Sequence, residues 1–289
     1  MVFVPPNFEL YSTESRKVRE IFERYATKVE PLSLDEAYLD VTESPHCQGS
    51  ATLMARQIRQ EIFSERGLTA SAGVAANKFL AKIASDWKKP NGQFVIRPQD
   101  VEKFMPALPV EKIFGVGKVT AEKMHNLGLK TCGDLQKLSV FELQKNFGTS
   151  RAQELFQLCR GEDDRQVRTD WERKSLSVEE TFGRDRQNLE ELLLELPGIF
   201  GDWVRRMDQG SYWEKIRGLV VKVKYFDFQG TTHEQATQSR PTIEDFERLI
   251  RAVWLKRQSP VRLLGVGVRL AARKDQSAEA FSTQLHLAV

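Results

Sequence analysis

Cysteine and histidine are scarce in this sequence, and their scarcity limits the metal and redox sites that it can form. The 289 residues include three cysteines and four histidines. Cys47, Cys132 and Cys159 lie far apart and are odd in number, which argues for reduced thiols in a cytosolic protein. They form no CxxC zinc pattern with the isolated histidines. We therefore expect neither a disulfide framework nor a structural zinc site, and we expect a cytoplasmic location.

Long hydrophobic runs are also missing. No apolar stretch approaches the ~18–20 residues of a membrane span. The longest candidate, residues 192–200, is interrupted by Glu195, Pro197 and Gly198. The first six residues have no basic region of the kind that begins a signal peptide. We expect a soluble protein that makes no membrane contact.

Most of the chain carries no net positive charge. The total is +3, but residues 1–172 carry 24 basic and 24 acidic side chains, and residues 173–274 carry 19 basic and 14 acidic ones. The last 15 residues have no basic side chain. A polyanion is the natural partner for the region 173–274, although an excess of this size is a weak signal by itself.

The fold class that these patterns predict is α+β with several domains. Residues 1–97 alternate helical and strand-like spacing, including a helix over Val18 to Tyr25 capped near Ser12 and Thr13. Residues 98–161 are helical with glycine-rich breaks, and residues 162–172 are charged and read as a linker.

Residues 173–274 predict a strand, helix, strand, strand, helix, strand order, which is a ferredoxin-like sandwich with one open sheet face. The four strands are expected at residues 174–182, 216–228, 231–239 and 261–271. The alternation of Val223 and Tyr225 with Lys222 and Lys224 predicts an apolar and a basic face. Residues 275–289 form a tail.

Two adjacent carboxylates, Asp35 and Glu36, lie in residues 33–40, SLDEAYLD, at a turn between strand-like segments. Burying such a pair beside apolar residues is costly unless a cation neutralises it. Mg²⁺ prefers a few carboxylate oxygens together with substrate phosphates, and polymerases use two such ions for in-line displacement. On spacing alone, an exposed acidic turn is the simpler interpretation.

A basic segment follows at residues 72–92. Small residues before Asn77 would let the backbone approach a ligand closely, and the N-terminus of the helix expected there favours anions. Lysine side chains suit a triphosphate as point charges. Composition alone is equally compatible with a solvated basic face. Four lysines oppose the one acid Asp86 within 12 residues: Lys78, Lys82, Lys88 and Lys89.

Residues 114–124, FGVGKVTAEKM, contain two closely spaced glycines, Gly115 and Gly117, followed by Lys118. Glycines allow a tight turn whose amide groups point at one phosphate, and the next helix adds its positive end without reading a base. Most such glycine pairs are plain turns. An amphipathic helix follows this pair, which favours a DNA-binding hairpin.

Residues 173–179, RKSLSVE, begin the last domain. Arg173, Lys174, Ser175 and Ser177 could bind backbone phosphates from the helix-free face of its sheet. The alternative is ordinary protection of an edge strand by charge.

The tail ends in Gln284, Leu285 and Leu287. Two leucines at i and i+2 on an extended segment could fill a groove of a partner protein. A frayed terminus is the alternative.

In combination, these motifs resemble those of the Y-family DNA polymerases over residues ~7–274. SLDEAYLD is similar to the central palm motif, and residues 72–92 match the segment that follows it. FGVG looks like the helix-hairpin-helix of the thumb, RKSLSVE like the start of the little finger, and QLHL like a peptide that docks on the sliding clamp.

The resemblance implies a role for each motif. Asp35 would bind magnesium, with two ions expected, and Glu36 would be the catalytic carboxylate. Lys89 would contact the incoming nucleotide's phosphates, and Lys82 would support that site. The other implied contacts are to DNA from Gly115, Gly117, Lys118, Arg173, Lys174, Ser175 and Ser177, and to a sliding clamp from Gln284, Leu285 and Leu287.

The sequence departs from the family's pattern at its start. Asp35 is the first aspartate, so the family's opening metal-binding Asp, its aromatic gate and its fingers subdomain are not in the sequence. Loss of one bridging carboxylate would weaken metal binding and primer alignment. We therefore expect a catalytically incomplete chain.

The function predicted is template-directed, lesion-bypass DNA synthesis: magnesium-dependent nucleotidyl transfer from a dNTP to a primer 3′-hydroxyl by a monomer on primer–template DNA. The alternative is a non-catalytic remnant that binds DNA and the clamp. A metal-dependent nuclease would also use Asp35 and Glu36, but it gives no reason for the lysine cluster.

Overall fold

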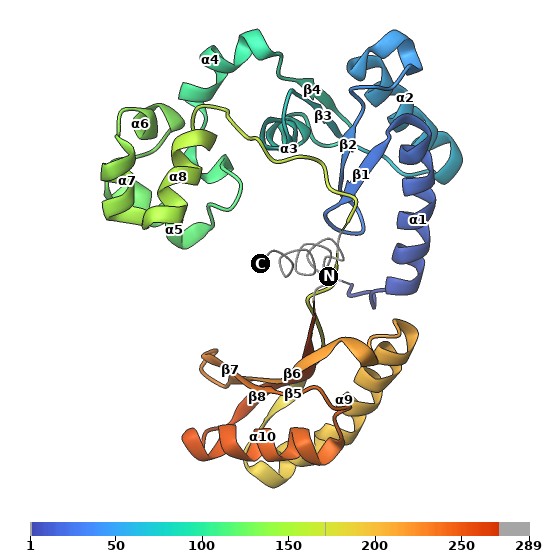
Figure 1. Ribbon diagram of the computed structural model, residues 1–289, viewed down its shortest axis with the longest axis vertical. Coiled ribbons are helices and arrows are strands. Elements are labelled where there is room, and N and C mark those ends of the chain that lie inside the picture. Colours follow the sequence, from blue (N-terminus) through green and yellow to red (C-terminus); the bar gives the residue numbers. More distant parts are fainter. Residues whose placement is uncertain (1, 171, 272–289) are drawn as a thin grey trace, which may run out of the picture. The chain divides into compact units, whose positions relative to one another are not determined.

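The computed structural model describes residues 2–170 and 172–271 (Figure 1). It divides into two compact units, Met1–Trp171 and Glu172–Val289. Within the described residues, no helix combines the length and apolar character needed to span a bilayer. The mixture of α/β, all-helical and ferredoxin-like parts confirms the α+β class predicted from the sequence.

The first unit begins with a mixed α/β part. Its first two strands form an antiparallel hairpin, and its last two strands pair in parallel. The elements in chain order are α1 (Phe8–Tyr25), β1 (Lys28–Pro31), β2 (Ala37–Asp40), α2 (Ala51–Arg66), β3 (Ala72–Val74), α3 (Lys78–Trp87) and β4 (Gln93–Val95).

Helix α1 begins earlier than the sequence pattern suggested. The side chain of Asn7 accepts a hydrogen bond from the Leu10 amide and caps the helix. The predicted caps are wrong, because Ser12 and Thr13 lie inside the helix, where the Ser12 hydroxyl donates to the Phe8 carbonyl. Periodicity located the helix, and the capping side chain decided its first residue.

A helical part completes the first unit. Its helices are α4 (Val101–Phe104), α5 (Lys118–Asn126), α6 (Cys132–Gln136), α7 (Val140–Phe147) and α8 (Thr149–Leu158). Thr131 and Ser139 begin α6 and α7 with capping boxes. Buried residues of α3 and of these helices form one continuous hydrophobic core, so the core runs across the domain boundary predicted at residue 97.

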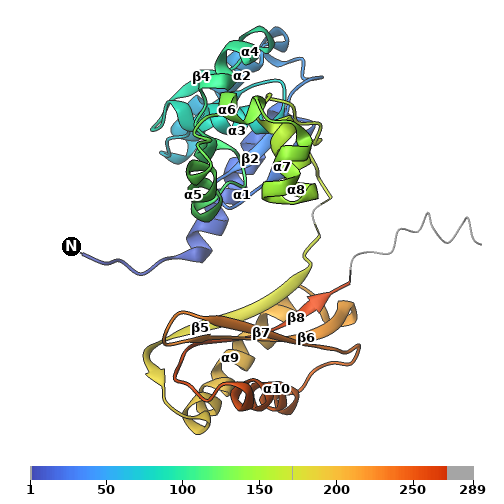
Figure 2. The same ribbon diagram turned by 90° about the vertical axis from the view of Figure 1, so that its left-hand side faces the viewer.

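The second unit has the predicted strand and helix order. A four-stranded antiparallel sheet is arranged β5-β8-β6-β7, and both helices cover one of its faces (Figure 2). The predicted strand 216–228 ends earlier, because residues 226–229 form the turn to the next strand. The elements are β5 (Ser175–Arg186), α9 (Leu189–Gln209), β6 (Ile216–Tyr225), β7 (Gly230–Ala236), α10 (Ile243–Lys256) and β8 (Val261–Leu270).

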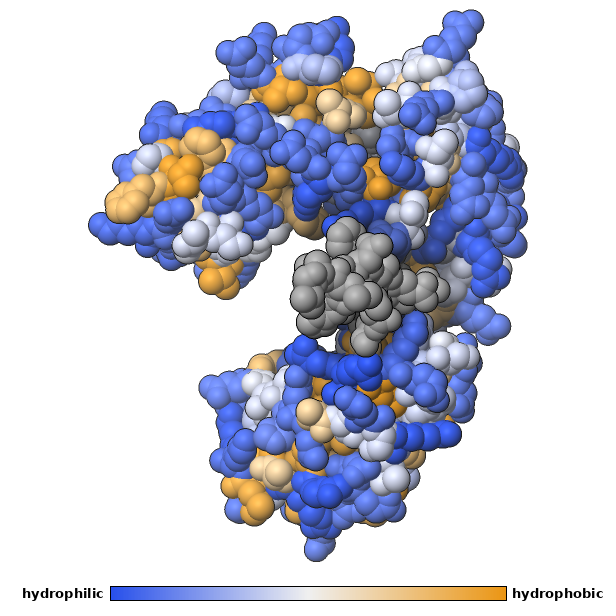
Figure 3. All heavy atoms as spheres, in the orientation of Figure 1, coloured by the Kyte–Doolittle hydropathy of each residue, from blue (hydrophilic) through white to orange (hydrophobic). Residues whose placement is uncertain are grey.

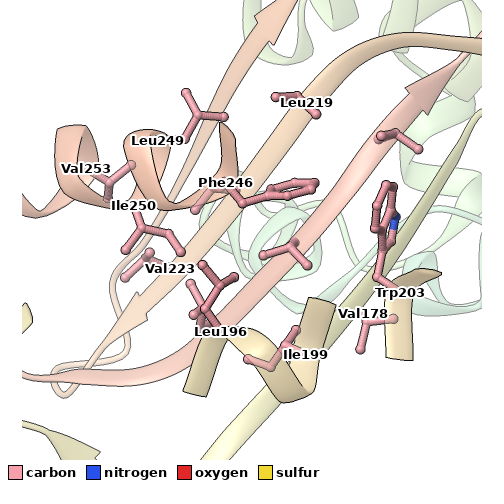
Figure 4. Close-up of a cluster of buried hydrophobic side chains, with 14 of the residues drawn as sticks. Val178, Leu196, Ile199, Trp203, Leu219, Val223, Phe246, Leu249, Ile250 and Val253 are labelled. Atoms are coloured by element: carbon pink, nitrogen blue, oxygen red, sulfur yellow. The ribbon is translucent and has the colours of Figure 1, made fainter. Parts of the chain in front are cut away.

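The core of the second unit lies between this sheet and its two helices (Figure 4). Trp203 of α9 and Phe246 of α10 are fully buried and meet edge to face, with ring centroids 5.2 Å apart. Val223 points into this core, and the neighbouring Lys222 and Lys224 lie on the other face of the sheet, as the alternation predicted. On the face drawn in Figure 3, the outer surface of each unit is mostly hydrophilic, with small apolar patches.

Candidate functional site

The turn between β1 and β2 presents the two predicted carboxylates. Residues 33–35 form the turn, which is closed by a hydrogen bond from the Leu32 amide to the Glu36 carbonyl at 2.9 Å. The Ser33 hydroxyl donates to Asp35 Oδ1 at 2.6 Å. The Asp35 side chain is exposed at the tip of the turn, and Glu36 follows immediately before β2.

Helix α3 brings a line of charged side chains to Glu36. Lys82 Nζ donates to Glu36 Oε1 at 2.6 Å, and this pair is only partly exposed. One turn further along the helix, Asp86 forms an ion pair of 2.7 Å with Lys89. The two site lysines are therefore each held by a carboxylate, and α3 connects both pairs.

The charges of the turn and of α3 act on one another. The hydrogen bond that Lys89 donates to Asp86 raises the pKa of Lys89, and the charges of Glu36 and Asp35 raise it further. Burial opposes ionisation of Asp86, but Lys89, Lys82 and Lys112 together lower its pKa below the ordinary value. These side chains form one charge cluster, in which carboxylates and lysines alternate.

The chemistry of this cluster fits a hard divalent cation. Asp35 and Glu36 offer adjacent carboxylate oxygens, and Asp35 is accessible to solvent. Among residues 2–170 and 172–271, no group of three or more histidine, cysteine, aspartate or glutamate side chains forms a metal site. The remaining ligands of a cation held by these two carboxylates would come from phosphate oxygens and water.

The other two lysines of the basic segment lie elsewhere. Lys78 is buried, pairs with Glu30 at 2.6 Å and lies over the ring of Tyr38. Lys88 Nζ lies 5.8 Å from the ring centroid of Phe94. The sequence cluster of four lysines therefore separates into two that approach the carboxylates of the turn and two that do not.

The predicted anion site at the start of α3 is wrong for an external ligand, since a side chain of the protein occupies it. The Asp163 carboxylate accepts the Phe79 amide at 2.9 Å, and Asn77 caps the Leu80 amide. The small residues before the helix serve packing: a Cβ on Gly73 would lie 2.0 Å from the Ala81 carbonyl oxygen.

The glycine pair forms the predicted tight turn before α5. Gly115 has φ +82°, a conformation that favours glycine, and a Cβ there would lie 3.1 Å from the Arg151 guanidinium. Gly117 precedes α5, where no side chain caps the helix and nothing lies within 4 Å of an added Cβ. Lys118 is highly exposed in the first turn of α5. No side-chain cap therefore occupies the N-terminus of α5, the end of a helix that attracts anions.

The helix-free face of the second unit's sheet carries the start of β5. Ser175 and Ser177 are exposed on β5, and Glu179 reaches across β8 to pair with Lys222 of β6 at 2.7 Å. Gly265 on β8 permits this crossing, since a Cβ there would lie 2.7 Å from the Glu179 side chain. Polar and charged side chains of β5 and β6 therefore share this face of the sheet, with Gly265 of β8 between them.

Lys174 and Arg173 lie just before β5. The Lys174 carbonyl accepts the Leu270 amide at 2.9 Å, which continues the pairing of β5 with β8. Arg173 lies just before it, 5.9 Å from the ring centroid of Tyr212. Gln284, Leu285 and Leu287 lie outside the described residues.

Sequence reasoning missed three members of these sites. Asp86 was recognised only as the acid within a basic segment, although its spacing of three from Lys89 is typical of a helical ion pair. Lys112 and Arg151 carried no local signal, because the fold alone brings them to Asp86 and to Gly115.

Family models match most of the chain. The impB/mucB/samB family matches residues 1–86, the "DNA polymerase-iota, thumb domain" model matches residues 111–163, and the impB/mucB/samB C-terminal domain matches residues 173–285. The chain is 50% identical to DNA polymerase IV of Protochlamydia amoebophila over 95% of its own length and 78% of that protein's. It is 47% identical to DNA polymerase IV of Ectopseudomonas mendocina over 93% and 76%.

Solved structures of Y-family DNA polymerases also match the chain. A Y-family DNA polymerase chimera, Dbh-Dpo4(243-245)-Dbh, matches with a TM-score of 0.83 and 27% identity, over 94% of this chain and 79% of that one. A ternary complex of Dbh DNA polymerase matches with a TM-score of 0.60 and 27% identity, over 93% and 78%.

The two hairpin glycines should respond differently to an added methyl group. Gly115→Ala should lower the free energy of unfolding by roughly 1–2 kcal/mol, because a residue with a Cβ is strained at positive φ. Gly117→Ala, at φ −84° in open space, should change it by less than about 0.5 kcal/mol. Urea denaturation followed by circular dichroism measures both, and equal losses would contradict this assignment of the turn.

Proposed function

The chain belongs to the DNA polymerase IV group of the Y-family DNA polymerases, and from this membership we propose that it functions in template-directed, lesion-bypass DNA synthesis. The reaction would be magnesium-dependent nucleotidyl transfer from a dNTP to a primer 3′-hydroxyl. The proposal rests above all on one observation: the Asp35-Glu36 turn and the Lys82, Asp86 and Lys89 side chains form one charge cluster.

Within this cluster, Asp35 and Glu36 would hold Mg²⁺, with two ions expected at the complete site. When bound, the metal supplies charge stabilisation at the transferring phosphoryl group and activates the attacking hydroxyl. Lys82, now paired with Glu36, and Lys89, now paired with Asp86, would turn toward the triphosphate. Both pairs are partly exposed, so the cost of exchanging their partners is small.

DNA would be held by sequence-independent contacts to its backbone. The uncapped N-terminus of α5 at Gly117 and the Lys118 side chain would bind a phosphate, with Gly115 shaping the turn. On the second unit, Arg173, Lys174, Ser175 and Ser177 would contact further phosphates along the open sheet face. These residue roles, a monomeric state and a cytoplasmic location are parts of the proposal.

A non-catalytic remnant that only binds DNA and a clamp is the less favoured alternative. The relatives at 45–50% identity are named DNA polymerase IV. A protein that only binds DNA and a clamp would not need the two adjacent carboxylates of the turn or the lysines beside them. Measured incorporation of dNTPs distinguishes the two functions.

Replacing either turn carboxylate should abolish nucleotide chemistry and leave DNA binding intact. Asp35→Asn and Glu36→Gln should each lower Mg²⁺-dependent primer extension by on the order of 100-fold or more, because a misplaced reacting group already costs that much. Extension by the unchanged chain should itself be slow. The described residues offer only Asp35 and Glu36 at the turn, and they include no group of three side chains that could hold a metal ion.

Mg²⁺-dependent binding of a dNTP, measured by fluorescence, gives a second readout for the same two variants. Asp100→Asn, which removes an exposed carboxylate that pairs with Arg97, is the control. Wild-type dNTP affinity in both turn variants would show that the metal site lies elsewhere.

Duplex affinity should fall steeply with salt, because phosphate contacts release counterions. Lys118→Met should reduce the slope of log affinity against log salt by about 1, as expected for one lost contact. Lys256→Met, at the end of α10 on the helix-covered side of the sheet, should leave the slope unchanged. Anisotropy titrations between 50 and 200 mM salt measure this, and a flat dependence would contradict phosphate binding.

The tail would dock on a sliding clamp through Gln284, Leu285 and Leu287. Two buried leucines at roughly 1.5–3 kcal/mol each, before ordering costs, support a weak contact that suffices when DNA provides a second attachment. Deleting residues 282–289 should leave DNA binding unchanged and remove binding to the clamp in a pull-down or titration. Equal clamp binding by the deleted chain would refute this docking.

A further inference from the structure

The turn between α3 and β4, residues 88–92, carries Lys89, the lysine that the proposed function assigns to the triphosphate. All of this turn except Gly92 is exposed. Its backbone is tightly folded, because Asn91 has φ +47° and a Cβ on Gly92 would lie 1.7 Å from the Lys88 carbonyl oxygen. The residue types of the turn therefore fix its shape, but they do not fix where it lies on the first unit.

Arg59 of α2 reaches this turn from another part of the first unit. Its Nη2 donates to the Asn91 carbonyl at 2.6 Å and to Asn91 Oδ1 at 2.9 Å. Its Nε donates to the Ala70 carbonyl at 2.8 Å, two residues before β3 begins. One partly buried guanidinium therefore joins α2, the segment that leads into β3 and the turn that leads into β4.

These hydrogen bonds are not required to satisfy buried groups. Asn91 is exposed, so water would replace the guanidinium at its two acceptors at little cost. All three acceptors are neutral oxygens, and an unbranched apolar side chain such as methionine would fill much of the same space on α2. What neither water nor methionine supplies is a rigid planar link between two segments. The effect of Arg59 is therefore on where the turn lies.

The position of the turn decides where the Lys89 ammonium group can go. Lys89 pairs with Asp86 at 2.7 Å, but its side chain is half exposed, so this pair is exchangeable and holds the turn only weakly. The charges of Glu36 and Asp35 also act on Lys89, which shows that the turn directs this side chain toward the carboxylates. A lysine side chain has many rotamers, and ordering it on a phosphate costs less when its backbone is already in place.

We propose that Arg59 is a positioning residue for nucleotide binding, which fixes the turn that carries Lys89 and so places the Lys89 ammonium group for the triphosphate. This inference rests on the proposed function, in which Lys89 contacts the phosphates of a dNTP. The hydrogen bonds of Arg59 go to Ala70 and Asn91, so it acts on the nucleotide through the turn. Its effect should therefore vanish when Lys89 is replaced.

The first test measures Mg²⁺-dependent binding of a fluorescent nucleotide, 2-aminopurine deoxynucleoside triphosphate, to the full chain. Lys89→Met should weaken binding on the order of tenfold, because a charge-assisted hydrogen bond is lost. Arg59→Met should weaken it by about threefold to tenfold, because Lys89 must then be ordered during binding. In the Lys89→Met background, Arg59→Met should cause less than about a twofold further loss. General damage to the fold would cause the same loss in both backgrounds.

Three further variants separate position from charge and from folding. Arg56→Met removes the same charge from an exposed site on the same helix and should bind like wild type. Arg59→Lys keeps the charge and can reach one acceptor, so it should bind within about threefold of wild type. Asn91→Gly keeps the left-handed backbone and removes only the Oδ1 acceptor, so it should lose about twofold, and it tests the contact even if Arg59→Met fails to fold.

Primer extension gives a second functional readout. When chemistry is slow, the KM for the dNTP equals its Kd. Arg59→Met should therefore raise the KM by the factor measured in binding and change kcat by less than about twofold, because the turn acts on nucleotide binding. A loss of folded protein would lower kcat and leave the KM unchanged.

Trypsin cleavage after Lys88 measures the turn without any nucleotide, because cleavage follows the population of the open turn. Mass spectrometry identifies the fragment. Cleavage there should be about threefold to tenfold faster in Arg59→Met than in the intact chain, and Arg56→Met should be cut at the wild-type rate.

Either of two results would overturn the proposal. If Arg59→Met is cut after Lys88 no faster than the intact chain, Arg59 does not hold the turn. If cleavage is faster but nucleotide binding is unchanged, or falls equally in the Lys89→Met background, the position of the turn is not used. Wild-type nucleotide affinity in Lys89→Met would refute the proposed role of Lys89 and this role with it, while the cleavage rates would still report whether Arg59 holds the turn.

Discussion

The division of α3 into an apolar and a charged side is the constraint on which the first unit depends. Phe79, Leu80 and Ile83 are buried in the core that joins the mixed α/β part to the helical part. Lys82 and Asp86 emerge on the opposite side and meet the β1–β2 turn and Lys89. A rotation of the helix that exposed its apolar side would also disperse the charge cluster.

Opposite charges organise this cluster before any ligand arrives. Each site lysine is held by a carboxylate, so its side chain has already lost part of its conformational freedom. Under the proposed function, a triphosphate with its metal ion would offer both signs of charge and would replace both kinds of partner. The two pairs are partly exposed, which makes them exchangeable, whereas the Glu30–Lys78 pair is largely buried.

The start of α3 shows how a local signal can be used by the protein itself. The helix N-terminus attracts an anion, as its dipole requires, but the anion is the Asp163 carboxylate, 84 residues further along the chain. The same contact ties the segment that follows α8 to α3. The second unit also joins distant charges, on the helix-free face of its sheet. Gly265 of β8 has no side chain, so Glu179 of β5 can reach across it to Lys222 of β6.

The sequence alone determined the element order, the inward and outward faces of the second sheet, the glycine hairpin and the adjacent carboxylates. These features depend on the period of apolar residues and on local backbone preferences, which act over a few neighbouring positions. Only the tertiary structure decided which lysines approach Glu36, which anion caps α3, and that Lys112 and Arg151 join the sites. Such pairings depend on distances between segments far apart in the chain, which packing sets and which no local pattern records.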